Sequence, residues 1–158
     1  MGTDTGSYVR GFNTFSELYK DSSLKWNKEP GFWLLNQLGH ALGNNYAVLL
    51  ILVAATTYAS VLTIIVKYSD SLLISLFVYI TLCYSTFCVN AARQGIAVGI
   101  YMLSFPYLLK RDFKRYVLVV LAAAMFHKTV VVAIPMYFLF TMEYSFKTVV
   151  IMVVGSVA

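Results

Sequence analysis

Long apolar runs separated by short charged segments dominate the chain from residue 46 onward. The first run, residues 46–66, is 21 positions long and contains no charged side chain. As an α-helix it would measure about 31 Å, which is enough to cross the hydrocarbon core of a bilayer. The same pattern recurs along the rest of the chain. It predicts transmembrane helices over about 46–66, 72–89, 93–109 and 116–141, and the first half of another over 148–158.

Two of these runs are interrupted. The run 93–109 contains Pro106, where we expect a kink, and it is short unless residues 90–94 form its first turn. The run 116–141 carries His127 and Lys128 near its middle. It fits either one long tilted helix or two half-spans in a re-entrant hairpin, because halves of 11 and 13 residues are each too short to cross alone. The sequence leaves both arrangements open.

Residues 1–45 form a polar arm in front of the spans, and we expect two short amphipathic helices in it. Aromatic residues recur in the arm at spacings of 4, 3 and 4, which places them along one helical stripe. These residues are Tyr8, Phe12, Phe15 and Tyr19. We favour a helix that lies on the bilayer with its aromatic face down. The alternative is a stacking platform for sugar rings.

The second helix of the arm is predicted to begin at Pro30 and to end at residues 43–45, Gly-Asn-Asn, because proline suits the first helical position. Its predicted buried stripe consists of Phe32, Leu35, Leu38 and Leu42. Another face carries Glu29, Trp33, Asn36 and His40. This face is either a binding edge or a solvated surface, and we expect His40 by itself to be structural.

The composition agrees with a membrane protein. Apolar residues make up 59% of the 158 residues and charged residues only 12%, whereas soluble domains are nearer half apolar and a quarter charged. A chain this short cannot bury that much apolar surface in its own core. We therefore expect lipid to be its solvent. Disorder, a collagen-like chain and a disulfide scaffold are excluded. The fold class we predict is an all-α, polytopic transmembrane helical bundle with short interfacial helices in the arm.

The remaining chemistry is sparse. The net charge of +5 is not gathered on a basic face, so we expect no nucleic-acid partner. Cys83 and Cys88 are five positions apart in an apolar run and are interpreted as small buried hydrophobic residues. Two separated histidines and two buried cysteines predict no metal site. We expect no cofactor.

The positive-inside rule predicts the orientation. Four of the six residues 110–115 are basic, which places this loop in the cytoplasm. Counting back, residues 90–94 lie outside, 67–70 inside and 1–45 outside. A polar arm of this length rarely crosses without a preceding helix, and the last run stops half-way. We therefore expect the chain to be a fragment of a larger polytopic protein.

This orientation gathers the candidate functional groups in the outer half of the membrane, where ionisable side chains are costly and usually functional. Arg93 and Gln94 lie at the outer mouth of their span, and His127 lies about 17 Å up from the cytoplasmic face. Arg93 is either a snorkelling anchor or, as we favour, a buried donor to a phosphate or carboxylate. His127 is either a core histidine bonded to a backbone carbonyl or, as we favour, a proton-transfer group in a hydrated cavity. Asp4 and Glu29 are expected to be exposed carboxylates.

Four motifs in this order resemble the EpsG family, Wzy-like multi-span proteins of bacterial exopolysaccharide and capsule assembly. They are residues 2–8, Gly-Thr-Asp-Thr-Gly-Ser-Tyr, followed by Phe12 and Phe15; Glu29-Pro-Gly-Phe32 with Leu35; Arg93-Gln-Gly-Ile-Ala97; and Phe126-His127. The resemblance covers essentially the whole chain. Two features depart from it: the family has membrane spans before the first motif and after the last, and Lys128-Thr129 stands where a small residue and a serine are expected.

The resemblance implies a glycosyltransferase-type polymerase on the outer leaflet of the bacterial cell membrane. It would transfer a glycan from undecaprenyl pyrophosphate to the terminal sugar of another lipid-linked repeat unit, with no cofactor. The implied partners are this lipid-linked oligosaccharide, the bilayer and other exopolysaccharide assembly proteins.

The implied chemistry assigns roles to the candidate residues. Cationic and polar donors would bind the pyrophosphate, and these are Arg93, Gln94 and Arg10. The implied catalytic residues are His127, Glu29 and Asp4, with His127 or Glu29 as the base for the acceptor hydroxyl. Sugar contacts would come from Tyr8, Trp33 and Asn36. The alternatives are a transporter or flippase of lipid-linked sugars, and a truncated membrane fragment without function.

Overall fold

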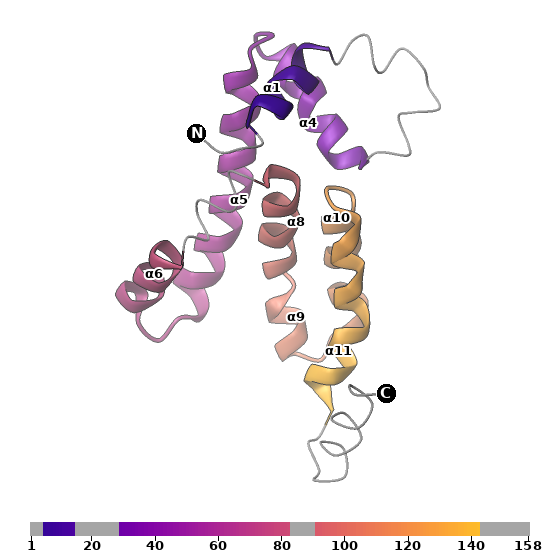
Figure 1. Ribbon diagram of the computed structural model, residues 1–158. Helices are drawn as coiled ribbons and strands as arrows, with labels where there is room; N and C mark the ends of the chain where they lie inside the picture. The colour runs from indigo at the N-terminus through magenta and orange to yellow at the C-terminus, as the bar shows by residue number, and fades with distance from the viewer. Residues whose placement is uncertain (1–4, 15–28, 83–90, 143–158) are drawn as a thin grey trace, which may run out of the picture.

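The computed structural model describes residues 5–14, 29–82 and 91–142. Throughout these ranges the regular structure is helical, which confirms the predicted all-α class for this part of the chain. The elements in chain order are α1 (Thr5–Asn13), α4 (Pro30–Ala41), α5 (Tyr46–Tyr68), α6 (Leu72–Thr81), α8 (Ala92–Met102), α9 (Phe105–Leu109), α10 (Phe113–Ala124), the 3₁₀ turn η1 (Lys128–Val132) and α11 (Ala133–Thr141). Figure 1 shows their arrangement.

Helix α5 corresponds to the first predicted span. Asn45 caps its N-terminus, because the side-chain oxygen accepts a hydrogen bond from the Ala47 N–H at 2.9 Å. The helix is 23 residues long, and within the described ranges it is the one helix long and apolar enough to cross a membrane. It ends at Tyr68, with Ser69 as its C-cap, next to the predicted charged boundary.

Helix α8 packs along α5 through small side chains. A Cβ atom placed on Gly99 would lie 3.3 Å from both the Cα and the carbonyl oxygen of Thr57, and 3.6 Å from the Ser60 Cβ. The two backbones approach this closely because Gly99 has no side chain, as is common where membrane helices meet. The contact fixes α8, and with it Arg93, against the longest helix of the structure.

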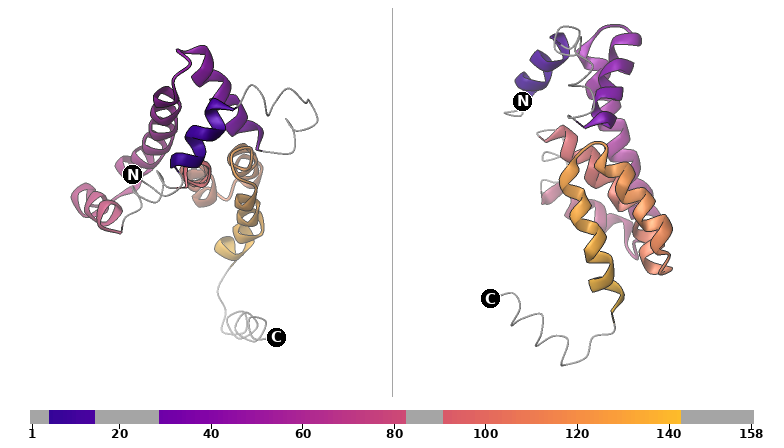
Figure 2. Two further views of the ribbon diagram at one scale, coloured as in Figure 1. Left: turned by 45° about the horizontal axis from the view of Figure 1, so that its top comes forward. Right: turned by 90° about the vertical axis from the view of Figure 1, so that its right-hand side faces the viewer.

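Helices α10 and α11 form a hairpin. The chain leaves α10 at Ala124 and turns back through η1 into α11, as the right-hand view of Figure 2 shows. The Tyr116 hydroxyl donates to the Ala133 carbonyl oxygen at 2.8 Å, and the Tyr116 and Tyr137 ring centroids are 5.0 Å apart. Of the two arrangements open for 116–141, the single long helix is therefore wrong, and the chain breaks around His127.

The run 93–109 is also divided. Its first helix, α8, begins at Ala92 and so includes Arg93 and Gln94 in its first turn. It stops at Met102, and α9 starts three residues later with Pro106 in its first turn. The predicted kink is thus a break that lies before the proline.

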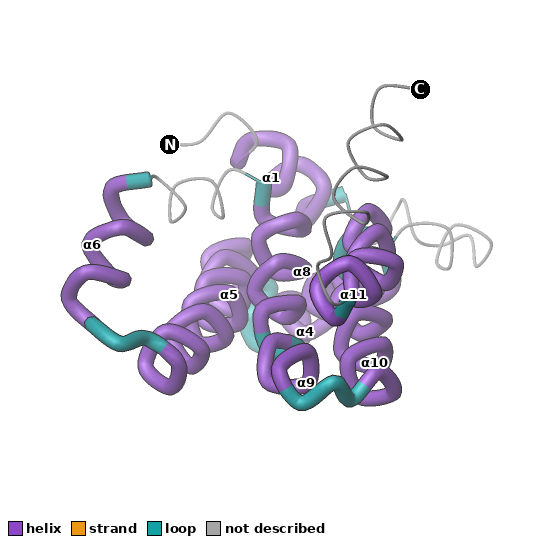
Figure 3. Tube along the Cα trace, turned by 90° about the horizontal axis from the view of Figure 1, so that it is seen from below, coloured by secondary structure: helices purple, strands orange, loops and turns teal. Residues whose placement is uncertain are grey.

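Helix α6 covers only the beginning of the predicted run 72–89, because residues 83–90, including both cysteines, lie outside the described ranges. None of its residues is buried, and it lies beside the end of α5, away from α10 and α11, in Figures 1 and 3. The predicted half-span 148–158 is likewise not among the described residues.

The buried face of α4 differs from the predicted stripe. Leu35 is buried as expected, but Leu42 is 63% exposed and Leu38 is exposed as well. The face turned inward carries Gly31, Leu35 and Gly39, which recur every fourth residue. The reason is that aromatic rings occupy the space beside both glycines: a Cβ on Gly31 or Gly39 would lie 2.9 Å from the nearest ring atom of Phe126 or Phe12, respectively.

Phe12 also corrects the prediction for the aromatic stripe of the arm. Its side chain is 1% exposed and stacks on the His40 ring at 3.9 Å between centroids, so it belongs to the protein core and neither faces the bilayer nor offers a sugar platform. His40 is structural, since its ring nitrogens lie 2.6 Å from the Asn44 side-chain oxygen and 3.1 Å from the Phe12 carbonyl oxygen. Phe15 and Tyr19 fall outside the described ranges.

Candidate functional site

Glu29 is the point at which three distant segments meet. Its Oε2 accepts a hydrogen bond from Arg93 Nη1 at 2.9 Å, and its Oε1 lies 2.7 Å from His127 Nδ1. The partners stand 64 and 98 positions away in the sequence. One carboxylate from the arm therefore joins the start of α8 to the tip of the α10–α11 hairpin.

The local backbone turns the Glu29 side chain away from its own helix. Glu29 is the N-cap of α4 with φ 42° and ψ 81°, in the left-handed region, and its carboxylate makes no cap hydrogen bond. A non-glycine residue in that region costs roughly 1–2 kcal/mol, which the surrounding structure must offset. Pro30 follows with its fixed φ and begins the helix. This geometry frees the carboxylate to contact Arg93 and His127.

Glu29 is 8% exposed, so the expectation of an exposed carboxylate was wrong. A buried carboxylate requires partners that compensate for the lost water, and the guanidinium and the imidazole supply them. The sequence placed Glu29 in a polar arm and contained no sign of partners so far along the chain.

The Arg93 guanidinium is hydrogen-bonded to Glu29, while part of the side chain is exposed to solvent. Nη1 is held by Glu29, the guanidinium lies over the Phe32 ring at 5.9 Å from its centroid, and it also interacts with the Tyr8 hydroxyl. Yet its side chain is 46% exposed. Arg93 is thus a half-buried donor to a carboxylate, and because a guanidinium has five N–H donors it retains capacity for an anionic ligand.

His127 is held by its Nδ1 atom. It follows the end of α10 in an extended conformation and its side chain is 29% exposed. The alternative of a core histidine bonded to a backbone carbonyl does not fit, since Nδ1 contacts Glu29. Because a carboxylate oxygen accepts hydrogen bonds, this contact favours the tautomer with the hydrogen on Nδ1, which leaves the lone pair on Nε2.

A cluster of buried apolar side chains lies next to these groups. The buried core cluster comprises Phe12, Leu35, Leu49, Val53, Ala92 and Ile96. Tyr8, Phe32 and Phe126 are partly buried and pack against it. The Tyr8 and Phe32 ring centroids are 5.8 Å apart, so the two rings form a continuous aromatic surface next to Arg93.

The other predicted site residues that the structure describes are not part of the Glu29 bridge. Gln94 is exposed beside Arg93, Arg10 is exposed on α1, and Trp33 is half-buried on α4. Asn36 is buried and its amide donates to the Phe32 carbonyl oxygen at 2.8 Å, so the face of α4 that carries Glu29 and Asn36 is not a solvated one. Asp4 lies outside the described ranges.

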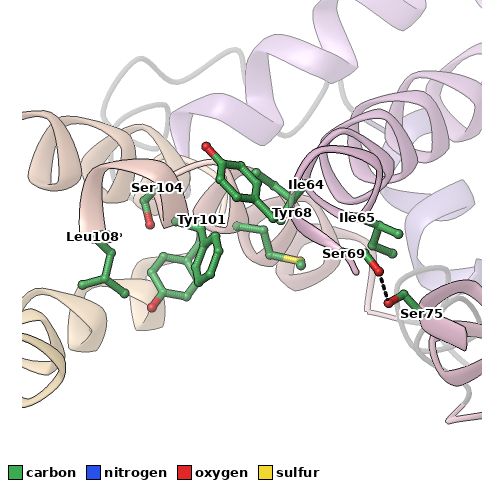
Figure 4. A pocket seen from close by; sticks show the side chains of 10 residues that line it. Ile64, Ile65, Tyr68, Ser69, Ser75, Tyr101, Ser104 and Leu108 are labelled. Atoms are coloured by element: carbon green, nitrogen blue, oxygen red, sulfur yellow. Dashed lines mark hydrogen bonds between the residues drawn. The ribbon is translucent and has the colours of Figure 1, made fainter. Parts of the chain in front are cut away.

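A separate pocket lies far from these polar groups, between the last turn of α5, the start of α6 and the α8–α9 break (Figure 4). It has a volume of about 360 Å³ and is lined mainly by aliphatic and aromatic side chains. Its polar groups are hydroxyls, including Ser69 and Ser75, whose oxygens are 2.6 Å apart. Its lining residues include no carboxylate, imidazole or basic side chain, so we place the chemistry at Glu29 and not here.

Metal ligation has no support in the described residues, where no group of three His, Cys, Asp or Glu side chains gathers. The chemistry available at Glu29 is that of a carboxylate, an imidazole and a guanidinium. This set can hold an anion and move a proton.

Comparison with known proteins identifies the family. The family model of the EpsG family matches residues 1–158, the whole chain. No curated protein and no solved structure matches it. The EpsG family consists of Wzy-like polymerases, membrane proteins of polysaccharide biosynthesis, and this chain belongs to it.

Proposed function

We propose that the protein is a glycosyltransferase-type polymerase, which joins undecaprenyl-pyrophosphate-linked repeat units into exopolysaccharide or capsule. The observation that carries this proposal is the bridge formed by Glu29 between Arg93 and His127. It brings an anion-binding group and a proton acceptor together at one end of the structure. Membership of the EpsG family supports the same chemistry.

In this reaction His127 is the general base. With Nδ1–H donated to Glu29, Nε2 accepts the proton of the acceptor sugar hydroxyl as its oxygen attacks the anomeric carbon of the donor. Glu29 orients the imidazole and stabilises the positive charge that develops on it. Glu29 is therefore a positioning residue in this scheme, with His127 as the base.

In the proposed reaction Arg93 stabilises the leaving group. As the new glycosidic bond forms, the bond from the anomeric carbon to the pyrophosphate oxygen breaks, and undecaprenyl pyrophosphate leaves with the electron pair. The exposed part of the guanidinium donates to this oxyanion, and Gln94 and Arg10 add further donors. Tyr8 and Trp33 contact the sugars. Because the donor is already activated, the chain needs neither a nucleotide nor a covalent intermediate.

The proposed setting is a multi-pass protein of the bacterial cell membrane with residues 1–45 on the outer face. The arm helices, the start of α8 and the hairpin tip share one end of the structure, while the turns after α5 and α9 lie toward the other (Figure 1). Lys67 lies in the last turn of α5, and the turn after α9 carries basic residues from Lys110 on, as the positive-inside rule requires of cytoplasmic loops. The partners we propose are the lipid-linked oligosaccharide, the bilayer and other exopolysaccharide assembly proteins.

Polymer length in cells tests the proposal. A strain that lacks the gene is complemented with His127→Ala or Arg93→Ala, and each is expected to lose long polymer while single repeat units persist. His40→Gln is the matched control, because His40 contacts Phe12 and Asn44 and lies outside the Glu29 bridge. Immunoblots of the membrane fraction check that the variants are present in equal amounts.

Normal chain length in both variants would refute the site. Accumulation of repeat units on the cytoplasmic leaflet would instead identify a transporter of the same lipid-linked sugars. The inner half of the predicted spans carries no Lys, Arg, His, Asp or Glu side chain, which favours the polymerase over a transport path lined by charged groups.

A further inference from the structure

We propose that Gly31 and Phe126 form a positioning pair that sets the contact between Glu29 and His127. The pair consists of residues without ionisable groups, each within two positions of the group that it positions. Its consequence for catalysis rests on the proposed function, whereas its effect on the Glu29–His127 contact does not.

A backbone hydrogen bond joins the two segments. The Gly31 N–H donates to the Met125 carbonyl oxygen at 2.8 Å. The donor belongs to the first turn of α4 and the acceptor to the residue that ends α10. Both groups lack a partner within their own helices, so each helix end satisfies the other.

The Phe126 ring covers Gly31 on the same side. A Cβ atom on Gly31 would lie 2.9 Å from the ring atoms Cε2 and Cζ and 3.0 Å from Cδ2. Such distances are too short, so the space is available to the ring because residue 31 has no side chain. Phe126 also packs against the core cluster below, which limits how far its ring can retreat.

At most one residue separates each member of this pair from the functional group that it positions. Glu29 precedes Gly31 by two residues with Pro30 between them, and His127 directly follows Phe126. A shift between Gly31 and Phe126 is therefore transmitted to the 2.7 Å contact between Glu29 Oε1 and His127 Nδ1. Hydrogen bonds weaken over a few tenths of an ångström, so this contact responds to a small displacement.

The test uses Gly31→Ala in the full-length protein purified in detergent. Gly31 has no positive φ and lies in a helix, where alanine is the better former, so a disturbed site is attributable to the added methyl group. Gly39→Ala is the matched control. Gly39 lies in the same helix as Gly31 but away from the Glu29 bridge. A Cβ at residue 39 would lie 2.9 Å from a ring atom of Phe12. Gly31→Ala combined with Phe126→Leu removes the ring that the methyl group would meet.

The direct readout is the ¹⁵N spectrum of the histidine side chains, in which the His127 signals are assigned with His127→Gln. The wild type and Gly39→Ala are expected to show His127 protonated at Nδ1. Gly31→Ala is expected to lose this tautomer preference, and the double variant to regain it. An unchanged His127 spectrum in Gly31→Ala, or the same change in Gly39→Ala, would overturn the positioning role.

Polymer formation is the second readout. Gly31→Ala is expected to lower it roughly tenfold or more, since small misplacements of catalytic groups have effects of this size, and the double variant is expected to restore part of it. If the His127 tautomer changes while polymer formation stays normal, the positioning pair stands and the proposed function fails. The two proposals are thereby tested separately.

Discussion

At the scale of single residues, the structure replaces a set of separate candidates by one carboxylate with two partners. Arg93 and His127 were predictable, because an ionisable group within an apolar run stands out in the sequence. The family resemblance implied a catalytic role for Glu29, but its burial and its position between Arg93 and His127 could not be predicted from the local sequence. Its importance comes from burial and from contacts across 64 and 98 positions, which only the folded chain contains.

Glu29→Gln tests this role. The substitution keeps the size of the side chain and removes its charge, so Arg93 loses its ion pair and the amide competes poorly for His127 Nδ1–H. We expect long polymer to be lost and the free energy of unfolding to fall by about 1–2 kcal/mol, since the contact involves a charged but half-exposed partner. Polymer length and thermal unfolding in detergent measure the two effects.

Asp70→Asn is the control for Glu29→Gln. Asp70 is an exposed acidic residue between α5 and α6, away from the Glu29 bridge, and its neutralisation is expected to leave polymer length unchanged. Equal polymer length in Glu29→Gln and in Asp70→Asn would contradict the bridging role of Glu29.

At the scale of elements, hydropathy located the apolar runs but did not show which runs are single helices and which contain several. Helix α5 matches its predicted span closely because a single helix accounts for the whole run. The runs 93–109 and 116–141 each divide into shorter helices. The sequence located the possible break at His127 without deciding for it, and it predicted a kink at Pro106 where the structure has a break a few residues earlier. The breaks depend on contacts between segments, such as the hydrogen bond from Tyr116 to Ala133. The buried face of α4 was misjudged for a related reason: glycines were not counted as core positions, although aromatic rings pack over them.

Tyr116→Phe tests the hairpin. The Tyr116 side chain is fully buried, and loss of its hydroxyl leaves the Ala133 carbonyl oxygen without this donor. We expect the free energy of unfolding to fall by about 1–2 kcal/mol. Tyr46→Phe, at the exposed start of α5, is the matched control and should have little effect. Equal thermal stability of the two variants would show that the Tyr116 hydroxyl does not hold the hairpin.

Gly99→Val tests the contact between α5 and α8. The added side chain would meet the backbone of Thr57, which cannot move aside as a flexible side chain does. We expect a loss of about 1–3 kcal/mol in stability, typical of overpacking. A smaller effect is expected for Gly11→Ala, where nothing lies within 4 Å of the added Cβ. Thermal unfolding of both variants is the measurement, and an unaffected Gly99→Val would show that the helices can separate without cost.

At the scale of the whole molecule, the Glu29 bridge and the basic turn after α9 lie at different ends of the part that the structure describes. Glu29, Arg93 and His127 gather near the arm, and the basic turns lie toward the far end (Figure 1). The membrane orientation that the positive-inside rule predicts from the order of charges and apolar runs stays a prediction. The position of α6 away from α10 and α11 and the pocket beside it had no counterpart in the sequence pattern.

Cysteine labelling tests the orientation that we propose. Cys83 and Cys88 are first replaced by alanine, and single cysteines are then introduced at Asn44 or at Arg111. A membrane-impermeant maleimide is expected to label position 44 in intact cells and position 111 only after the membrane is opened. Both positions lie in turns between helices, so access to the reagent depends on the side of the membrane. Labelling of position 111 from outside would invert the proposed topology.

The Glu29 bridge also bears on how the protein is made. Its members come from the arm, from α8 and from the hairpin tip, so the ribosome delivers them one after another. A nascent chain that already contains Glu29 and Arg93 still lacks the imidazole of His127, so the polymerase reaction that we propose cannot yet begin. The complete Glu29 bridge therefore forms late in biosynthesis, once the third segment has been made and has folded back on the first two.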